Sequence, residues 1–189
     1  MNKAVSFTNR GAALEELIIM ANQSYRSRKK AVIHKVPTEW LPIRGKRPGE
    51  KKSKIVSAKV EKKAAVDFLG HILLPGGPLP LAFDAKEVSK GDRWPLSNLH
   101  EHQYEYLRDC ALTGAFSFVL IGYWQYQKFY ILPFPELELK WDIWKAGGRA
   151  AIKINDAWLV EVKFLDYLNF LWGDGSFDNS RNFRRIKEN

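Results

Sequence analysis

The sequence predicts an α/β fold in which helices flank a mixed β-sheet core. Three patterns indicate this fold: helical periodicity over residues 7–30, two short apolar strands around a Pro/Gly turn within 66–86, and a continuous apolar run at 115–124. The chain has 189 residues, which is long enough to bury a substantial core. We therefore expect a single domain over residues 1–172, and we expect the polar segment 173–189 to be a mobile tail.

The composition is that of a globular protein outside the secretory pathway. Hydrophobic residues make up 46% of the chain and charged residues 27%. The single cysteine, Cys110, can form no internal disulfide and leaves no cysteine cluster for zinc, which fits a reducing cytoplasm. No apolar run approaches the roughly 20 residues that span a bilayer, and the N-terminus lacks the apolar core of a signal peptide. We expect a cytoplasmic protein with no membrane association.

Positive charge is concentrated in one part of the chain. Residues 26–63 contain 14 Lys and Arg against three Glu, which exceeds the net charge of +9 of the whole chain. Scattered lysines often serve only to keep a loop soluble. A concentration of this kind favours a polyanionic partner instead, and nucleic acid is the expected one.

The first helix is expected over residues 7–30. Leucine, isoleucine and alanine recur there at helical spacing and form one apolar stripe. Glu15 lies in its early turns, where it could face solvent or lean toward a metal centre. Four cations close the helix: Arg26, Arg28, Lys29 and Lys30. They suit the negative end of the helix dipole, and they suit phosphate contacts equally well.

A strand at 31–36 is followed by an unusual segment, residues 37–60. It is rich in proline and glycine, and its tip between Arg44 and Lys54 is very basic, while β-branched residues flank the tip. This pattern predicts a long protruding hairpin, or stalk. An exposed projection of this length sacrifices core burial, so we expect it to insert into a groove or a branched opening of a nucleic acid.

The hairpin expected at 66–86 carries candidate catalytic side chains. Asp67 begins its first strand, and Asp84 and Lys86 come near the end of the second. Asp84 and Lys86 point to the same face because strand side chains alternate. Paired carboxylates are suitable ligands for Mg²⁺, which polarises a phosphate and lowers the pKa of a bound water, and a lysine can stabilise the developing charge. The alternative is a surface hairpin with a chance ion pair.

The remaining elements alternate between helix and strand. A helix is expected from Pro95 to Thr113, with Gln103 on its inner stripe, where a metal shell or a ligating acid could satisfy the amide. His100 and His102 would lie on different faces of this helix, which argues against a zinc pair. The later elements are a strand at 127–133, a helix at 135–144, a short strand or connector at 152–156, and a strand or helix at 159–172.

In this order, the segments resemble the RecU family of Holliday junction resolvases. The resemblance covers most of the chain, and it rests on NRGAALEELIIMANQSY (9–25), AVIHKVPT (31–38), AAVDFLG (64–70), FDAKE (83–87), RWPLSNLHEHQ (93–103), GGRAAI (147–152) and LDYL (165–168). It implies a restriction-endonuclease-like core with a protruding basic stalk. It further implies a homodimeric endonuclease that depends on Mg²⁺, with Mn²⁺ able to substitute. The enzyme would cut four-way DNA junctions by paired symmetric nicks in recombination and repair, with recombinase or branch-migration proteins as further partners.

The resemblance also assigns roles to individual residues. Asp67 and Asp84 correspond to the metal-binding acids, and Gln103 to a further residue of the metal shell. Lys86 corresponds to the lysine that stabilises the transition state, and Glu15 to an N-terminal acid near the site. The DNA-binding residues expected from the basic clusters are Arg10, Arg26, Arg28, Lys29, Lys30, Arg44, Lys46, Arg47, Lys51, Lys52 and Lys54.

Two departures from the family pattern keep other functions open. The family usually has glutamate at the position of Asp84, and Thr or Ser at the positions of Ala64 and Ala65, so a hydroxyl ligand is absent here. One alternative is a repair or restriction-type nuclease of the same fold that acts on other DNA structures. The other is a non-catalytic protein that binds junctions or modulates a recombinase.

Overall fold

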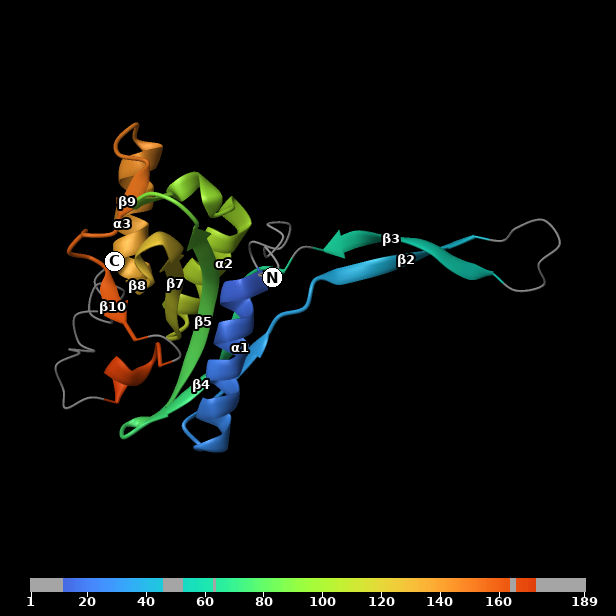
Figure 1. The fold of residues 1–189 in the computed structure, drawn as a ribbon, viewed down its shortest axis with the longest axis horizontal. Coiled ribbons are helices and arrows are strands. Elements are labelled where there is room, and N and C mark those ends of the chain that lie inside the picture. Colours follow the sequence, from blue (N-terminus) through green and yellow to red (C-terminus); the bar gives the residue numbers. More distant parts are fainter. Residues whose placement is uncertain (1–11, 46–52, 63, 164–165, 173–189) are drawn as a thin grey trace, which may run out of the picture.

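A mixed sheet forms the centre of the chain in this computed structural model, which describes residues 12–45, 53–62, 64–163 and 166–172. Within these residues the sheet has six strands in the order β1-β4-β5-β7-β8-β10, and two small two-stranded sheets, β2-β3 and β6-β9, accompany it. Strands β5 and β7 run parallel, and the other neighbouring pairs are antiparallel. The mixed α/β core expected from the sequence is therefore confirmed (Figure 1).

The elements follow one another along the chain as listed here by their bounds. They are α1 (Ala12–Ser27), β1 (Ala31–Lys35), β2 (Glu39–Gly45), β3 (Lys54–Lys62), β4 (Phe68–Leu74), β5 (Gly77–Val88), β6 (Arg93–Pro95), η2 (Leu96–Asn98), α2 (Glu101–Leu112), β7 (Phe116–Tyr123), η3 (Trp124–Tyr126), β8 (Lys128–Pro133), α3 (Phe134–Lys145), β9 (Ala151–Lys153), β10 (Val160–Val162) and η4 (Asn169–Leu171).

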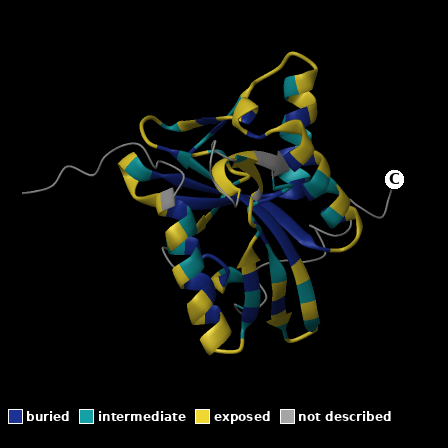
Figure 2. Cartoon of the chain, turned by 90° about the vertical axis from the view of Figure 1, so that its right-hand side faces the viewer, coloured by how far each residue is buried: buried dark blue, intermediate teal, exposed yellow. Residues whose placement is uncertain are grey.

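The apolar run predicted to be a central strand is β7, and every residue of it is buried. Its side chains alternate between two hydrophobic clusters. Phe118 and Leu120 join the cluster beneath α1, whereas Val119 and Ile121 join the cluster beneath α2 and α3. The sheet is therefore covered on both faces, with buried strands inside and the exposed sides of the helices outside (Figure 2).

The hairpin predicted at 66–86 is present as β4 and β5, with Phe68 opposite Phe83. Gly77, the first residue of β5 after the turn, has a φ of 117°, a positive value that glycine adopts without strain. Phe68 and Phe83 stack with ring centroids 4.9 Å apart on the face covered by α1. The residues that alternate with them, Asp67 and Asp84, are consequently directed to the other face.

The helix predicted from Pro95 to Thr113 starts later than expected. The chain first forms β6, which pairs with β9, and then η2; α2 begins only at Glu101. His100 just before it is extended, with φ −74° and ψ 150°. His100 and His102 were expected on different faces of one helix, but their rings stack 5.5 Å apart because His100 lies outside the helix. The sequence pattern is helical, but pairing with the distant strand β9 prevails locally.

Two other expected elements are shorter in the structure. Helix α1 ends at Ser27 rather than at residue 30, because Lys29 turns the chain into β1 with a positive φ of 57°. The segment expected as a strand or helix at 159–172 contains the short strand β10 and the η4 turn. Arg10, the tail at 173–189 and the start of the first predicted helix lie outside the described residues.

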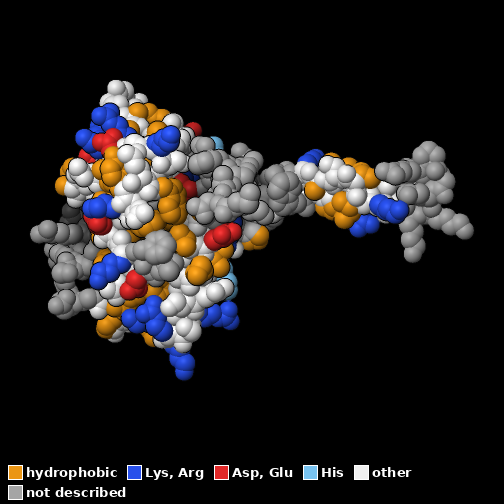
Figure 3. All heavy atoms as spheres, viewed as in Figure 1, with side chains coloured by type: hydrophobic (Ala, Val, Ile, Leu, Met, Phe, Trp, Pro, Cys, Tyr) orange, Lys and Arg blue, Asp and Glu red, His pale blue; other side chains and the backbone are white. Residues whose placement is uncertain are grey.

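Strands β2 and β3 form a separate ribbon that extends from the rest of the molecule in Figure 1. The predicted stalk at 37–60 falls on this ribbon. Its tip, together with Lys46, Arg47, Lys51 and Lys52, lies outside the described residues. Ile55 and Val56 are 62% and 60% exposed, and Figure 3 shows hydrophobic and cationic side chains together on the ribbon.

Within the described ranges, no helix has both the length and the apolar character needed to cross a bilayer.

Candidate active site

The sheet brings Asp67, Asp84 and Lys86 together. Asp67 immediately precedes β4 and its Oδ2 accepts a hydrogen bond of 2.8 Å from the backbone N–H of Ala85. Asp84 and Lys86 project from the same face of β5, and the Lys86 Nζ lies 2.6 Å from the Asp84 Oδ2. The juxtaposition expected from strand alternation is therefore present.

Asp84 is a buried acid with an amide on one oxygen and an ammonium on the other. Its side chain is 0% exposed, and its Oδ1 accepts a hydrogen bond of 2.9 Å from the Gln103 Nε2. The Lys86 ammonium meets its Oδ2 as an ion pair, and Asp67 is a second acid close by. A buried carboxylate that shares one ammonium with another acid is costly to ionise unless a further positive group meets the pair.

The electrostatics of the acid pair lead to the same conclusion. Burial raises the pKa of Asp84 above its ordinary value, the neighbouring Asp67 raises it further, and Lys86 only partly opposes them. At neutral pH the metal-free acid pair therefore retains a proton, because it is costly to ionise both carboxylates beside a single ammonium. A bound cation would remove this penalty.

Gln103 links the acid to the lysine. It belongs to the first turn of α2, where its Nε2 donates to Asp84. Its Oε1 accepts hydrogen bonds of 3.2 Å from the Lys86 Nζ and 3.1 Å from the His100 backbone N–H. The buried amide that the sequence placed on the inner stripe thus finds its partner in a candidate ligating acid. The same amide fixes the orientation of the ammonium.

The donor set fits a hard divalent cation. Across the described residues there is no cluster of three or more His, Cys, Asp and Glu side chains that could hold a metal. Mg²⁺ commonly binds through only one or two carboxylates and completes its shell with water and substrate phosphate. Asp67 and Asp84, which lie together where β4 begins to pair with β5, meet that requirement.

Glu15 lies on the other side of the sheet from this cluster. It forms an ion pair with Lys35 of β1, and Lys35 is opposite Phe68, whose side chain packs beneath α1. Directly paired residues share a face, so Glu15 and Lys35 belong to the α1 face. The structure brings Asp67, Asp84, Lys86 and Gln103 together, but it does not add Glu15 to their contacts.

Several cations expected to bind DNA already have partners within the chain. The Arg28 guanidinium lies 5.2 Å from the centroid of the Tyr25 ring, and the Lys30 Nζ lies 4.5 Å from that of Trp172. Arg26 is exposed beside a groove between α1 and β1 that His34 and Lys35 also line. Lys29 is exposed after α1, and Arg44 and Lys54 are exposed on the ribbon.

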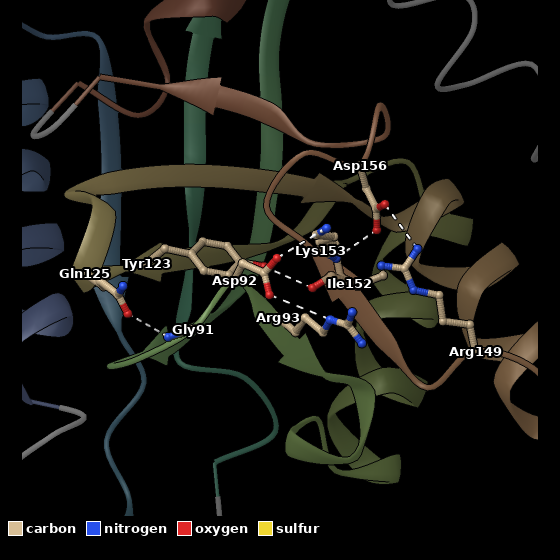
Figure 4. A network of polar contacts seen from close by, with 9 residues as sticks. All are labelled: Gly91, Asp92, Arg93, Tyr123, Gln125, Arg149, Ile152, Lys153 and Asp156. Carbon is tan, nitrogen blue, oxygen red and sulfur yellow. Dashed lines mark hydrogen bonds and ion pairs between the residues drawn. The ribbon is translucent and has the colours of Figure 1, made fainter.

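A polar network that sequence reasoning missed holds the segment between β5 and α2 (Figure 4). Asp92 lies 3.7 Å from the Arg93 Nε and 3.4 Å from the Lys153 Nζ. The Tyr123 hydroxyl donates to the Ile152 carbonyl at 3.2 Å. Asp92 and Arg93 are neighbours, but the contacts of Asp92 with Lys153 and of Tyr123 with Ile152 join residues 61 and 29 positions apart, so local patterns gave no signal of them. They anchor the chain that leads into α2 and hence to Gln103.

Comparisons with known proteins show the family to which the chain belongs. The family model described as RecU, Recombination protein U, matches residues 9–171. A protein named Holliday junction resolvase RecU from Oenococcus oeni is 31% identical over 181 residues, which cover 90% of each chain. Proteins of the same name from Pediococcus pentosaceus and Limosilactobacillus reuteri are each 33% identical, over 79% of this chain and 72% of theirs. Resemblance and comparison agree, and the chain belongs to the Recombination protein U (RecU) family.

Proposed function

We propose that this chain is an endonuclease that depends on a divalent metal and resolves four-way DNA junctions by paired symmetric nicks, in recombination and repair. The observation that carries the proposal is the fully buried Asp84, whose pKa is raised by burial and by Asp67, in contact with Lys86 and Gln103. The relatives named Holliday junction resolvase RecU support the choice of substrate.

Each residue of the cluster has a role in this proposal. Asp67 and Asp84 would hold Mg²⁺, or Mn²⁺ in its place, and Gln103 would complete the shell through its contact with Asp84. The metal would supply charge neutralisation at the phosphate and a lower pKa for an attacking water. The Lys86 ammonium, held by Gln103 and Asp84, would stabilise negative charge that develops on the phosphate oxygens. Glu15, which lies outside the cluster and pairs with Lys35, would add an acidic group on the α1 side of the sheet.

DNA would be recognised by backbone charge and shape. The positive charge of residues 26–63 exceeds that of the whole chain, and cations contact phosphates without reading base edges. We assign one nuclease domain to residues 1–172, with the stalk at about 37–60 as an insertion that reaches the junction. A homodimer matches a two-fold substrate. The single cysteine fits a reducing cytoplasm.

The test is cleavage of a mobile four-way junction across a Mg²⁺ titration, beside a linear duplex of matched sequence. Wild-type protein should cut the junction in a metal-dependent way, and Lys86→Ala should cut it at least about 100-fold more slowly, the scale of losing one charge-stabilising donor. Preference for the linear duplex would replace the resolvase with another nuclease. If wild type and Lys86→Ala are equally inactive but both bind the junction tightly, the chain is a non-catalytic junction-binding protein.

A further inference from the structure

Glu87, the residue after Lys86, connects the candidate catalytic strand to α1. Its side chain lies on the face of β5 opposite to Lys86, because neighbouring strand residues alternate. Its Oε1 accepts a hydrogen bond of 2.8 Å from the Leu14 backbone N–H. Its Oε2 accepts one of 2.8 Å from the Trp124 Nε1. Both carboxylate oxygens are therefore engaged, each by a different segment of the chain.

The bond to Leu14 fixes the start of a helix. Leu14 lies in the first turn of α1, where backbone N–H groups have no acceptor within the helix. A carboxylate there satisfies one such group and also interacts favourably with the positive end of the helix dipole. Glu87 thus supplies, from a strand 73 residues away, a contact that a capping residue normally provides locally.

The bond to Trp124 extends the connection to the neighbouring strand. Trp124 begins η3, directly after β7, and its ring meets Phe129 edge-on at 5.6 Å. Strand β7 pairs in parallel with β5, with Glu87 opposite Gly122. A single carboxylate therefore joins α1, β5 and the turn between β7 and β8, one residue from the ammonium of Lys86.

We propose that Glu87 is a positioning residue, which fixes α1 against the strand that presents Lys86. The inference rests on the proposed function, in which cations at the end of α1 contact DNA while Lys86 meets the phosphate to be cut. Arg26 is an exposed residue of α1, and α1 covers the face of the sheet opposite to Lys86. DNA held by α1 is aligned with Lys86 only if helix and strand keep a fixed relation. Displacements of about 1 Å can lower a rate 100-fold.

The decisive variant is Glu87→Gln, which keeps the shape of the side chain but offers an N–H group to one of the two donors. We expect kcat for junction cleavage to fall roughly 10-fold or more, within the range that misalignment produces, with KM for the junction within about twofold of wild type because the DNA-contacting cations are untouched. Glu16→Gln is the matched control, since exposed Glu16 lies in the same part of α1 and loses the same charge. The control should cleave like wild type.

Hydrogen exchange provides a readout that does not need activity. Amides in the first turns of α1 should exchange faster in Glu87→Gln than in Glu16→Gln, because Leu14 loses its acceptor. Unchanged exchange would overturn the inference, and so would a wild-type kcat per folded molecule. Wild-type protein that fails to cut junctions would refute the proposed function instead, while the exchange result would still decide whether Glu87 holds α1.

A second variant keeps the inference testable if Glu87→Gln does not fold. Trp124→Phe removes one donor and retains an aromatic ring against Phe129. We expect an intermediate kcat, because the bond to Leu14 remains. A kcat equal to that of wild type would refute the bridge from Glu87 to the turn after β7. If Glu87→Gln folds, its effect and that of Trp124→Phe should not add in the double variant, because both changes disrupt the Trp124–Glu87 hydrogen bond.

Discussion

At the scale of single residues, Asp84 trades stability for chemistry. It is buried beside a second carboxylate, and both burial and Asp67 raise its pKa. We expect Asp84→Asn to leave the metal-free protein as stable as wild type or more stable by up to about 1 kcal/mol, because an isosteric neutral group replaces an acid that burial and Asp67 make costly to ionise. The same change should lower junction cleavage at least about 100-fold, since a ligand for the catalytic ion is lost.

Stability with and without Mg²⁺ measures the two effects separately. Urea denaturation in EDTA reports the unfolding free energy of the metal-free fold. Addition of Mg²⁺ should raise the melting temperature of wild type, because a ligand that binds only the folded state stabilises it, and should raise that of Asp84→Asn much less. Ser117→Ala is a control, since Ser117 is also buried and polar but lies outside the acid cluster. A strong loss of stability in EDTA for Asp84→Asn would mean that the carboxylate supports the fold.

The sequence predicts that the two acids and the lysine lie together, and it does so for a physical reason. Strand periodicity is strict, so Asp84 and Lys86 had to share a face, and Asp67 had to meet them once the hairpin paired. Gln103 was also placed correctly, because the period of a helix determines which side chains face inward. Glu87 was missed. Its partners, Leu14 and Trp124, are 73 and 37 residues away, and no local pattern encodes such a contact.

At the scale of elements, the ribbon of β2 and β3 exposes apolar side chains that packing within the chain does not bury. Leu41 and Ile43 are 37% and 44% exposed on it, and Arg44 and Lys54 are also exposed on this ribbon. We expect the double variant Arg44→Gln, Lys54→Gln to bind junctions more weakly. The slope of log binding constant against log salt should become shallower by about two units, because each phosphate contact contributes about 0.9.

The control for the ribbon is an equal loss of charge elsewhere. Lys128 and Lys145 are exposed on the body and form ion pairs with Glu161 and Glu101. Their replacement by glutamine removes the same net charge, yet it should leave the salt slope nearly unchanged. Fluorescence anisotropy of a labelled junction at several salt concentrations gives both slopes. Equal slopes for the two double variants would show that the ribbon makes no phosphate contact.

Elements that depend on distant partners were the ones predicted least accurately. The helix expected from Pro95 begins at Glu101 because β6 pairs with β9, and about 55 residues separate the two strands. The segment after β10 is held to α1 by side chains. The Tyr167 hydroxyl donates to the Asn22 Oδ1 at 2.5 Å, and the Leu168 backbone N–H donates to the Tyr25 hydroxyl at 3.0 Å. Local periodicity does not indicate such pairings, whereas the continuous apolar sequence of β7 was sufficient to predict a buried strand.

At the scale of the whole molecule, the proposed activity requires two copies of the cluster, because one site can cut only one strand of a junction at a time. A two-fold dimer places one site on each of two symmetry-related strands. If resolution needs both sites, a dimer of one Lys86→Ala subunit and one wild-type subunit should be unable to make the paired cut. The prediction therefore concerns how activity depends on composition, and it is independent of where the interface lies.

Wild-type and Lys86→Ala chains, unfolded together in equal amounts and refolded, should form dimers in statistical proportion. About a quarter would then have two intact sites and about half would have one. On a plasmid with an extruded cruciform, paired nicks give linear DNA and single nicks give relaxed circles. The amount of linear product formed in one binding event should therefore fall to about a quarter of that given by wild-type protein. Relaxed circles should increase at the same time. If the subunits acted as independent monomers, cleavage would fall only to about half, in proportion to the fraction of wild-type chains. Such a result would contradict the dimeric mechanism.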